Sequence, residues 1–305
     1  MIQTLLAAAD PASHVYNHVW WQTENGLWLW SGNQGNLVLS ALILIPGMMW
    51  VASKIRTGPA SEGNERFVTK NRFAHMIEVM CVYLRDEVVR PLLNDRTDRL
   101  MPFLWTIFFF ILVNNILGLV PIMDLLHLIF PSWAAEHRTP IGGTATQNIW
   151  VTGVLALAAG LVFNAAAIKR LGIGGYLHHL TGGAPLIVAP LIFVLELAGQ
   201  LVIKPAALAI RLFANMTAGH ILLATLFLAA GTVWGKGFAI QGPVTLISVV
   251  GGAAVMFLEL FVAFLQAFVF MFLTTVFISL MDHHDEHGHD EHGHGHAHGH
   301  EHAKA

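Results

Sequence analysis

Two long apolar stretches, residues 186–230 and 243–281, contain the side chains most able to carry chemistry. Their ionisable and amide members are Glu196, Gln200, Lys204, Arg211, Asn215 and His220 in the first stretch, and Glu259 and Gln266 in the second. Four of these are formally charged, and each such charge costs about 3 kcal/mol in the middle of a membrane unless it is paired, hydrated or facing protein. A chain that keeps them in apolar surroundings is expected to use them.

Helical spacing places most of the first group on one face. At the angular step of an α-helix, the residues that share the face of Glu196 are Gln200, Lys204, Arg211 and Asn215. His220 falls on the face opposite Arg211. In the second stretch Glu259 and Gln266 share a face. The spacing therefore predicts a polar stripe around Arg211 and a histidine that points elsewhere.

A hairpin of the two stretches would place His220 level with Glu259 and Arg211 level with Gln266. The midpoint in number of each pair falls near residue 239. That point lies in a glycine-bounded segment, residues 235–242, where a connection is expected. One turn position accounts for both pairs, which makes coincidence the weaker explanation.

The two groups suit different tasks in proton transfer. Arginine stays protonated even in a poorly solvated site, so Arg211 would be a fixed positive charge that forces a passing carboxylic acid to release its proton. Imidazole titrates near neutrality, so His220 beside Glu259 suits a proton relay. Together they imply two aqueous paths separated by a positive barrier. The alternatives are an internal salt bridge from Arg211 to Glu196 or Glu259, and a packing role for His220.

The composition is that of an integral membrane protein. Of 305 residues, 55% are apolar and 11% are charged, against about 25% charged in average soluble chains. Nine of the 16 Lys and Arg lie between residues 54 and 99, and no basic cluster suits nucleic acid. The single cysteine, Cys81, excludes an internal disulfide, CxxC redox chemistry and a zinc-thiolate site.

We expect an all-α integral membrane protein with about five membrane-embedded helices and one interfacial amphipathic helix. Three ordinary spans are predicted at residues 37–52, 101–121 with a tail to 130, and 149–168. The two long stretches exceed the length that crosses about 30 Å of hydrocarbon, so we expect a strongly tilted hairpin joined at residues 231–242. Pro205 could kink its first helix, but the surrounding residues lack loop composition.

The shorter segments complete the predicted architecture. Residues 66–93 mix charged and apolar residues and predict an amphipathic helix on the cytoplasmic membrane face or, equally, against a partner subunit. Residues 58–64 are a linker, and residues 172–175 are a turn rather than a phosphate loop.

Basic residues predict the orientation and three regions of the chain. The positive-inside rule places the N-terminus outside and the C-terminus in the cytoplasm, with no cleaved signal peptide. Residues 1–36 are an expected extracytoplasmic segment, 37–281 the membrane domain and 282–305 a disordered cytoplasmic tail. Ten histidines in this tail could bind metal or buffer protons, or the tail could be a dispensable extension. The foremost candidate ligands are His283, His284, His287 and His289.

Three motifs resemble subunit a of F-type ATP synthases, the membrane stator subunit beside the rotating ring of c subunits. They are residues 204–220 (KPAALAIRLFANMTAGH), 265–270 (LQAFVF) and 115–121 (NILGLVP). The resemblance covers roughly residues 67–281, and Ala214 stands where the family usually has glycine.

The resemblance implies roles for these residues. Arg211 would be the stator arginine that faces the ring carboxylate, and the proton path would be lined by Glu196, Asn215, His220, Glu259 and Gln266. An outer path could include Asn115 and Asp124, although Asp124 could equally cap a helix end.

By this resemblance the chain is a non-catalytic subunit without a cofactor, and ATP chemistry resides on other subunits. Its partners would be c-ring subunits, peripheral-stalk b subunits, the rest of the complex and lipid, in a bacterial inner membrane. Two rival classes remain, a secondary transporter of divalent metal ions and a structural scaffold. Arg211 and Lys204 argue against the first because they repel cations, and buried charges argue against the second.

Overall fold

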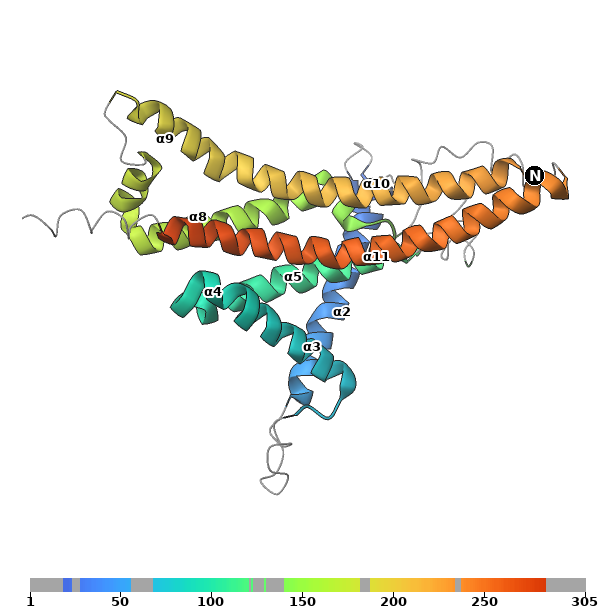
Figure 1. Ribbon diagram of the computed structural model, residues 1–305, viewed down its shortest axis with the longest axis horizontal. Coiled ribbons are helices and arrows are strands. Elements are labelled where there is room, and N and C mark those ends of the chain that lie inside the picture. The colour runs from blue at the N-terminus through green and yellow to red at the C-terminus, as the bar shows by residue number, and fades with distance from the viewer. Residues whose placement is uncertain are drawn as a thin grey trace, which may run out of the picture.

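The computed structural model is a helical protein with one small β-hairpin in the part of the chain that it describes (Figure 1). It describes residues 19–23, 28–55, 68–120, 122, 129, 140–181, 187–233 and 237–283. Five helices in these residues are long and apolar enough to cross a membrane: Gly32–Lys54, Arg72–Leu119, Ile149–His178, Ala189–Thr232 and Ile240–Leu280. The predicted fold class, an all-α multi-pass membrane protein, is confirmed.

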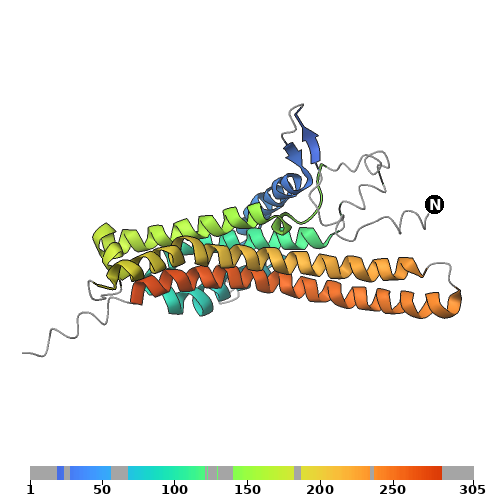
Figure 2. The ribbon, with the colours of Figure 1, turned by 90° about the horizontal axis from the view of Figure 1, so that it is seen from above.

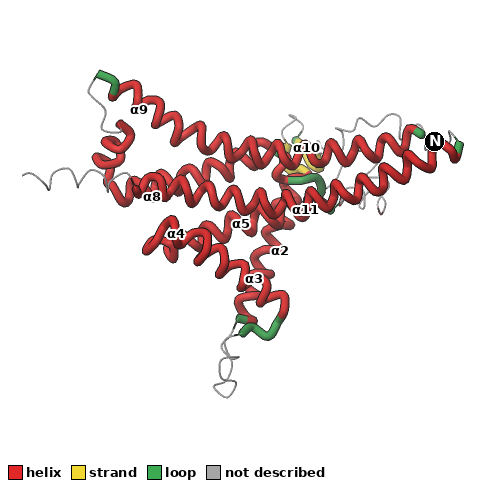
Figure 3. Tube along the Cα trace, viewed as in Figure 1, coloured by secondary structure: helices red, strands yellow, loops and turns green. Residues whose placement is uncertain are grey.

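The β-hairpin precedes the first helix that the structure describes and was not predicted. Strands β1 (Val19–Gln22) and β2 (Trp28–Ser31) pair antiparallel. Figure 3 draws the strands in yellow and the helices in red. The Asn25-Gly26 dipeptide between them is the sequence signal that favours a hairpin. Helix α2 (Gly32–Lys54) then begins five residues before the predicted span, because Ser31 and Gln34 form a capping box at its start.

The predicted amphipathic segment consists of consecutive helical elements that continue into the second span. It comprises α3 (Arg72–Tyr83), the π-helix η3 (Leu84–Val89), α4 (Arg90–Leu93) and the 3₁₀ turn η4 (Asn94–Arg96). Helix α5 (Thr97–Leu119) follows. The π-helix lies just before Pro91, whose ring clashes with the carbonyl four residues earlier in a regular α-helix.

Helix α8 (Ile149–Thr181) is longer than the predicted third span. It contains a kink at Gly172, where φ is 70°. This backbone region favours glycine, since other residues meet a steric penalty there. The predicted turn at residues 172–175 thus begins at an interruption of the helix.

The last two helical segments run side by side in an antiparallel pair (Figures 1 and 2). The first consists of α9 (Ala189–Ala198), the π-helix η6 (Gly199–Ile203) and α10 (Lys204–Thr232). The second is α11 (Phe238–His283). The predicted connection, residues 231–242, is too long, because Thr232 ends one helix and Phe238 begins the next. Their tilt relative to a membrane stays a prediction.

The core lies where α5, α8, α10 and α11 meet. Phe108, Phe163, Leu212 and Phe270 are fully buried there. The ring of Phe108 packs edge-on against Phe264 at a centroid distance of 5.7 Å, a favourable aromatic geometry. In Figure 2 these four helices lie alongside one another, and in Figure 1 α2 runs across the direction of α10 and α11. The bundle therefore holds α10 and α11 in a defined register.

Candidate functional site

The site is organised by a short segment between α5 and α8, residues 140–148, which we call the strap. Its centre is the 3₁₀ turn η5 (Ala145–Gln147), and Thr144, Ala145 and Thr146 are at most 1% exposed. Side-chain hydrogen bonds tie the strap to three helices. Asn36 Nδ2 of α2 donates to Gly143 O at 2.9 Å, and the others reach α5 and α10.

Thr146 and Gln147 of the strap make two of these other bonds. Thr146 Oγ1 donates to Asn115 Oδ1 of α5 at 2.8 Å, and Asn115 Nδ2 in turn donates to the carbonyl of Ala263 in α11 at 3.3 Å. Gln147 Nε2 donates to the carbonyl of Met216 in α10 at 3.3 Å. Because buried polar groups need partners, this network joins the strap, α5, α10 and α11 into one polar centre.

His220 lies at this centre with acceptors at both ring nitrogens. Its Nδ1 is 2.9 Å from the carbonyl of Met216, and its Nε2 is 3.1 Å from the carbonyl of Gly118. Thr144 Oγ1 is 3.2 Å from the same Nε2. A protonated ring can donate to both carbonyls, whereas a neutral ring has one N–H and leaves one carbonyl without it. The surroundings thus offer partners to either protonation state.

The carboxylate of Glu259 lies next to His220. Its Oε1 is 3.9 Å from His220 Nδ1, and the two side chains are 10% and 23% exposed, respectively. This Oε1 is buried and has no hydrogen-bond partner among the residues that the structure describes. A Cβ at position 219 would collide with it, so Gly219 is what allows the carboxylate to approach α10. The carboxylate of Glu259 therefore lies buried beside the imidazole of His220.

Arg211 and Asn215 lie on the exposed face of α10, one turn apart. Asn215 Nδ2 donates to Gln266 Oε1 of α11 at 2.8 Å, and Gln266 is 1% exposed. The sequence placed Gln266 level with Arg211; its hydrogen bond goes instead to the residue one turn further along. Among the described residues, no carboxylate lies within ion-pair distance of Arg211. The alternative of a salt bridge to Glu196 or Glu259 is therefore not formed.

The predicted polar stripe is divided in the structure. Gln200 is only 2% exposed and donates through Nε2 to Glu196 Oε1 at 2.8 Å. Lys204 Nζ lies 5.3 Å from the ring centroid of Phe277 in α11. The π-helix η6 explains the difference at Gln200, because more residues per turn rotate it away from the position that a regular α-helix gives relative to Arg211.

The remaining predicted residues fall in two groups. Asn115 is fully buried in the network of the strap. Asp124 lies outside the described residues, as do His284, His287 and His289 of the tail. His283 is the last residue of α11. Among the residues that the structure describes, no group of three or more His, Cys, Asp and Glu could hold a metal ion.

Sequence reasoning missed the strap and with it Thr144, Thr146 and Gln147. Their segment, with two glycines and two threonines, looks like an ordinary polar connection between spans. Nothing local indicates that it enters the bundle. A weak signal was the absence of charge from residues 139–148 in a loop expected to face water.

Comparisons with known proteins agree on one family. The family model described as ATP synthase A chain matches residues 36–279. ATP synthase subunit a of Myxococcus xanthus is 37% identical over 257 residues, which cover 81% of this chain and 76% of that protein. The protein of the same name from Chloroherpeton thalassium is 39% identical over 251 residues, covering 80% of this chain and 68% of that protein.

A further relative, ATP synthase subunit a of Anaeromyxobacter dehalogenans, is 40% identical over 255 residues, and the match spans 80% of this chain and 59% of that protein. The metal-transporter interpretation is left without support. The chain therefore belongs to the ATP synthase subunit a family, which its sequence motifs indicated, and is a non-catalytic, multi-pass membrane subunit.

Proposed function

We propose that this chain is the proton-translocating stator subunit of a rotary ATP synthase. One observation carries the proposal. Arg211 lies exposed on α10 without a carboxylate partner among the described residues, while His220 and Glu259 lie together behind it in the bundle. A fixed cation facing outward and a titratable pair facing inward are the two parts that transfer of protons to another subunit requires.

The exposed face of α10 suits close approach by a moving partner. Three alanines share it with Arg211, namely Ala207, Ala214 and Ala218. Small residues let another helix come near, so the guanidinium can reach a carboxylate on that helix. We assign this partner to the c-ring, and the positive charge of Arg211 then keeps the ring carboxylate ionised as it passes.

The polar side chains around Arg211 would line two aqueous half-channels separated by it. His220 and Glu259 relay the proton on one side, supported by Asn115 and the strap. On the other side Glu196 would exchange protons, while Asn215 and Gln266, joined by their hydrogen bond, border the arginine. The fixed charge prevents a proton from crossing directly between the two half-channels.

We further propose how the chain lies in the membrane. Because α2 crosses α10 and α11 in Figure 1, an upright α2 leaves those two helices strongly tilted. The distribution of Lys and Arg places residues 1–36 outside and residues 282–305 in the cytoplasm of a bacterial cell, with 37–281 as the domain in the inner membrane. Peripheral-stalk b subunits would be further partners.

Replacement of Arg211 by alanine tests the proposal. ATP-driven proton pumping and ATP synthesis by the complex in reconstituted vesicles should be lost, while ATP hydrolysis is partly kept. Arg211→Lys should fail too, because a poorly solvated ammonium can lose its proton. Arg72→Ala, which removes an exposed arginine of α3, is the matched control and should pump normally. Pumping by Arg211→Ala at the rate of the unaltered complex would refute the assignment.

A further inference from the structure

The β-hairpin at the start of α2 is rich in tryptophan. Four of the chain's nine tryptophans fall within residues 20–30, and the described parts of the hairpin, residues 19–23 and 28–31, contain no charged residue. Strand β2 runs directly into α2, because Ser31 ends the strand and caps the helix. Figure 2 shows the hairpin projecting beyond the start of α2, away from α10 and α11. None of the proposed steps of proton transfer uses this hairpin.

Apolar side chains are exposed on both faces of the hairpin. Trp21 of β1 is 64% exposed, and Leu29 of β2 is 51% exposed. Trp21 pairs with Trp30 across the two strands, so these two share a face. Leu29 precedes Trp30 by one residue and therefore points to the other face. A flat protein surface would cover only one of these faces, whereas a layer that surrounds the hairpin would cover both.

Two hydrogen bonds connect the hairpin and the start of α2 with the strap. Trp30 Nε1 donates to the carbonyl of Pro140 at 2.8 Å, and Gly142 N donates to the carbonyl of Gly32 at 3.3 Å. The strap leads into α8, whose second residue, Trp150, is 79% exposed. Exposed tryptophans thus lie at the starts of two spans that the strap connects. This pattern is typical of the aromatic belt at a membrane–water interface.

The far end of α2 has interfacial residues of its own. Trp50 lies 18 residues after Gly32, which is about 27 Å along a helix and close to the roughly 30 Å of hydrocarbon in a bilayer. The ring of Trp50 lies 6.3 Å from that of Phe73, and Lys54 Nζ lies 5.8 Å from the Trp50 ring centroid. Indole rings and lysine side chains near the end of a span mark the membrane–water interface. With Trp50 at one interface, the hairpin lies at the level of the other.

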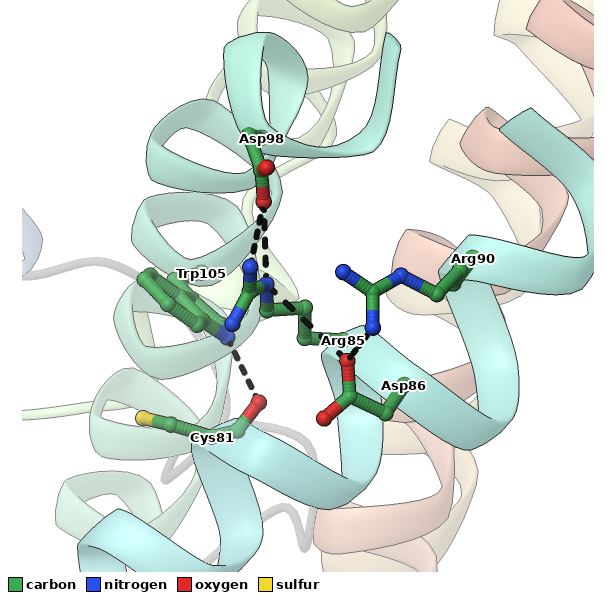
Figure 4. A network of polar contacts seen from close by, with 6 residues as sticks. All are labelled: Cys81, Arg85, Asp86, Arg90, Asp98 and Trp105. Atoms are coloured by element: carbon green, nitrogen blue, oxygen red, sulfur yellow. Dashed lines mark hydrogen bonds and ion pairs between the residues drawn. The ribbon is translucent and has the colours of Figure 1, made fainter. Parts of the chain in front are cut away.

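The segment that begins beside Trp50 is held by polar contacts, as Figure 4 shows. Arg85 Nη2 donates to Asp98 Oδ1 at 2.7 Å, and Trp105 Nε1 donates to the carbonyl of Cys81 at 3.2 Å. These contacts tie α3 and η3 to α5. The described strands of the hairpin have no charged side chain with which to form such an ion pair. Apolar surroundings are the remaining means of holding its exposed side chains.

We propose that the β1–β2 hairpin anchors the chain at the membrane interface, with Trp21 and Leu29 inserted between phospholipid headgroups and acyl chains. Tryptophan suits this depth because its ring is apolar while its N–H needs a polar partner. A lipid layer is favoured over a protein partner because both faces of the hairpin expose apolar groups and the hairpin continues directly into a span. The inference does not depend on the proton path. It needs only that α2 spans a membrane.

The test measures the depth of spin labels on the full-length chain in phosphatidylcholine vesicles. Labels are attached to Trp21→Cys or Leu29→Cys in a chain in which Cys81→Ser removes the native thiol. Collisions of each label with oxygen, which concentrates among acyl chains, are compared with collisions with a water-soluble nickel complex. Both labels should give an oxygen-to-nickel ratio between that of the free label in water and that of a label at Leu42→Cys, an exposed position inside α2. The ratio of the free label at both positions would overturn the proposal.

A second measurement keeps the label at Leu29→Cys and changes one tryptophan. Trp21→Gln should move the ratio toward that of the free label, because the hairpin loses an interfacial ring. The matched control, Trp150→Gln, removes an exposed tryptophan outside the hairpin and should leave the ratio unchanged. Equal ratios in these two variants would overturn the proposal. Rare collisions with both reagents would also overturn it and would assign the hairpin to a contact with protein.

Discussion

Simultaneous replacement of His220 and Glu259 tests whether the two side chains share one proton path. His220 Nδ1 and Glu259 Oε1 are 3.9 Å apart. Coulomb's law at an effective dielectric constant of about 20 gives roughly 4 kcal/mol for unit charges at that distance, which is an upper limit for the pair. Residues in contact usually show coupling energies of about 0.5–3 kcal/mol in double-mutant cycles. We expect about 1–3 kcal/mol here, because both side chains are largely buried.

The assay is passive proton flux through the membrane sector, freed of its soluble head, in vesicles with an imposed pH gradient. His220→Ala and Glu259→Ala should each slow the flux, because each leaves its partner without the group that supports its change of protonation. If the two residues acted independently, the loss of flux in the double variant would equal the product of the two single losses. We expect the measured loss to be smaller than that product by about fivefold or more.

The exchange His220→Glu with Glu259→His should recover more flux than either single exchange, since it keeps one imidazole and one carboxylate in contact. A matched control cycle pairs His220→Ala with Glu196→Ala, because Glu196 bonds to Gln200 and belongs to another network. That cycle should be additive within about 0.5 kcal/mol. Additive losses for the contacting pair, together with no recovery on exchange, would refute a shared path even if Arg211 kept its role.

Two further predictions concern the strap and the tail. Thr144→Val removes the hydroxyl at 3.2 Å from His220 Nε2 and should slow proton flux about two- to tenfold, which corresponds to the loss of one hydrogen bond. Thr144→Ser keeps the hydroxyl and should retain the rate. Equal losses in both variants would mean that Thr144 contributes only packing. Deletion of residues 284–305 should leave ATP synthesis in membranes nearly unchanged, because the tail follows the last helix and has no apolar face; a large loss at normal subunit levels would contradict this. Titration of the isolated tail peptide with zinc checks its metal-buffer interpretation separately.

At the two π-helices, the periodicity of a regular α-helix does not predict which side chains face the bundle. Both π-helices occur just before prolines, Pro91 and Pro205. The sequence identifies each proline as a strain point, but a kink, a break and a widened turn all relieve the same clash. Packing against the neighbouring helices decides among them. Before Pro205, the wider turn of the π-helix η6 rotates Gln200 toward the bundle. The helical wheel of a regular α-helix does not predict this position for Gln200.

The sequence by itself determined the fold class, the approximate spans and the family, because apolar runs and the motif around Arg211 are local properties that need no partner. It also indicated His220 with Glu259, since one turn sets the register of two long helices. Only the tertiary structure decided that Gln266 bonds to Asn215, and that Thr144 and Gln147 reach α10 from a distant loop. These contacts join segments far apart in the chain, and their geometry depends on how all the helices pack at once.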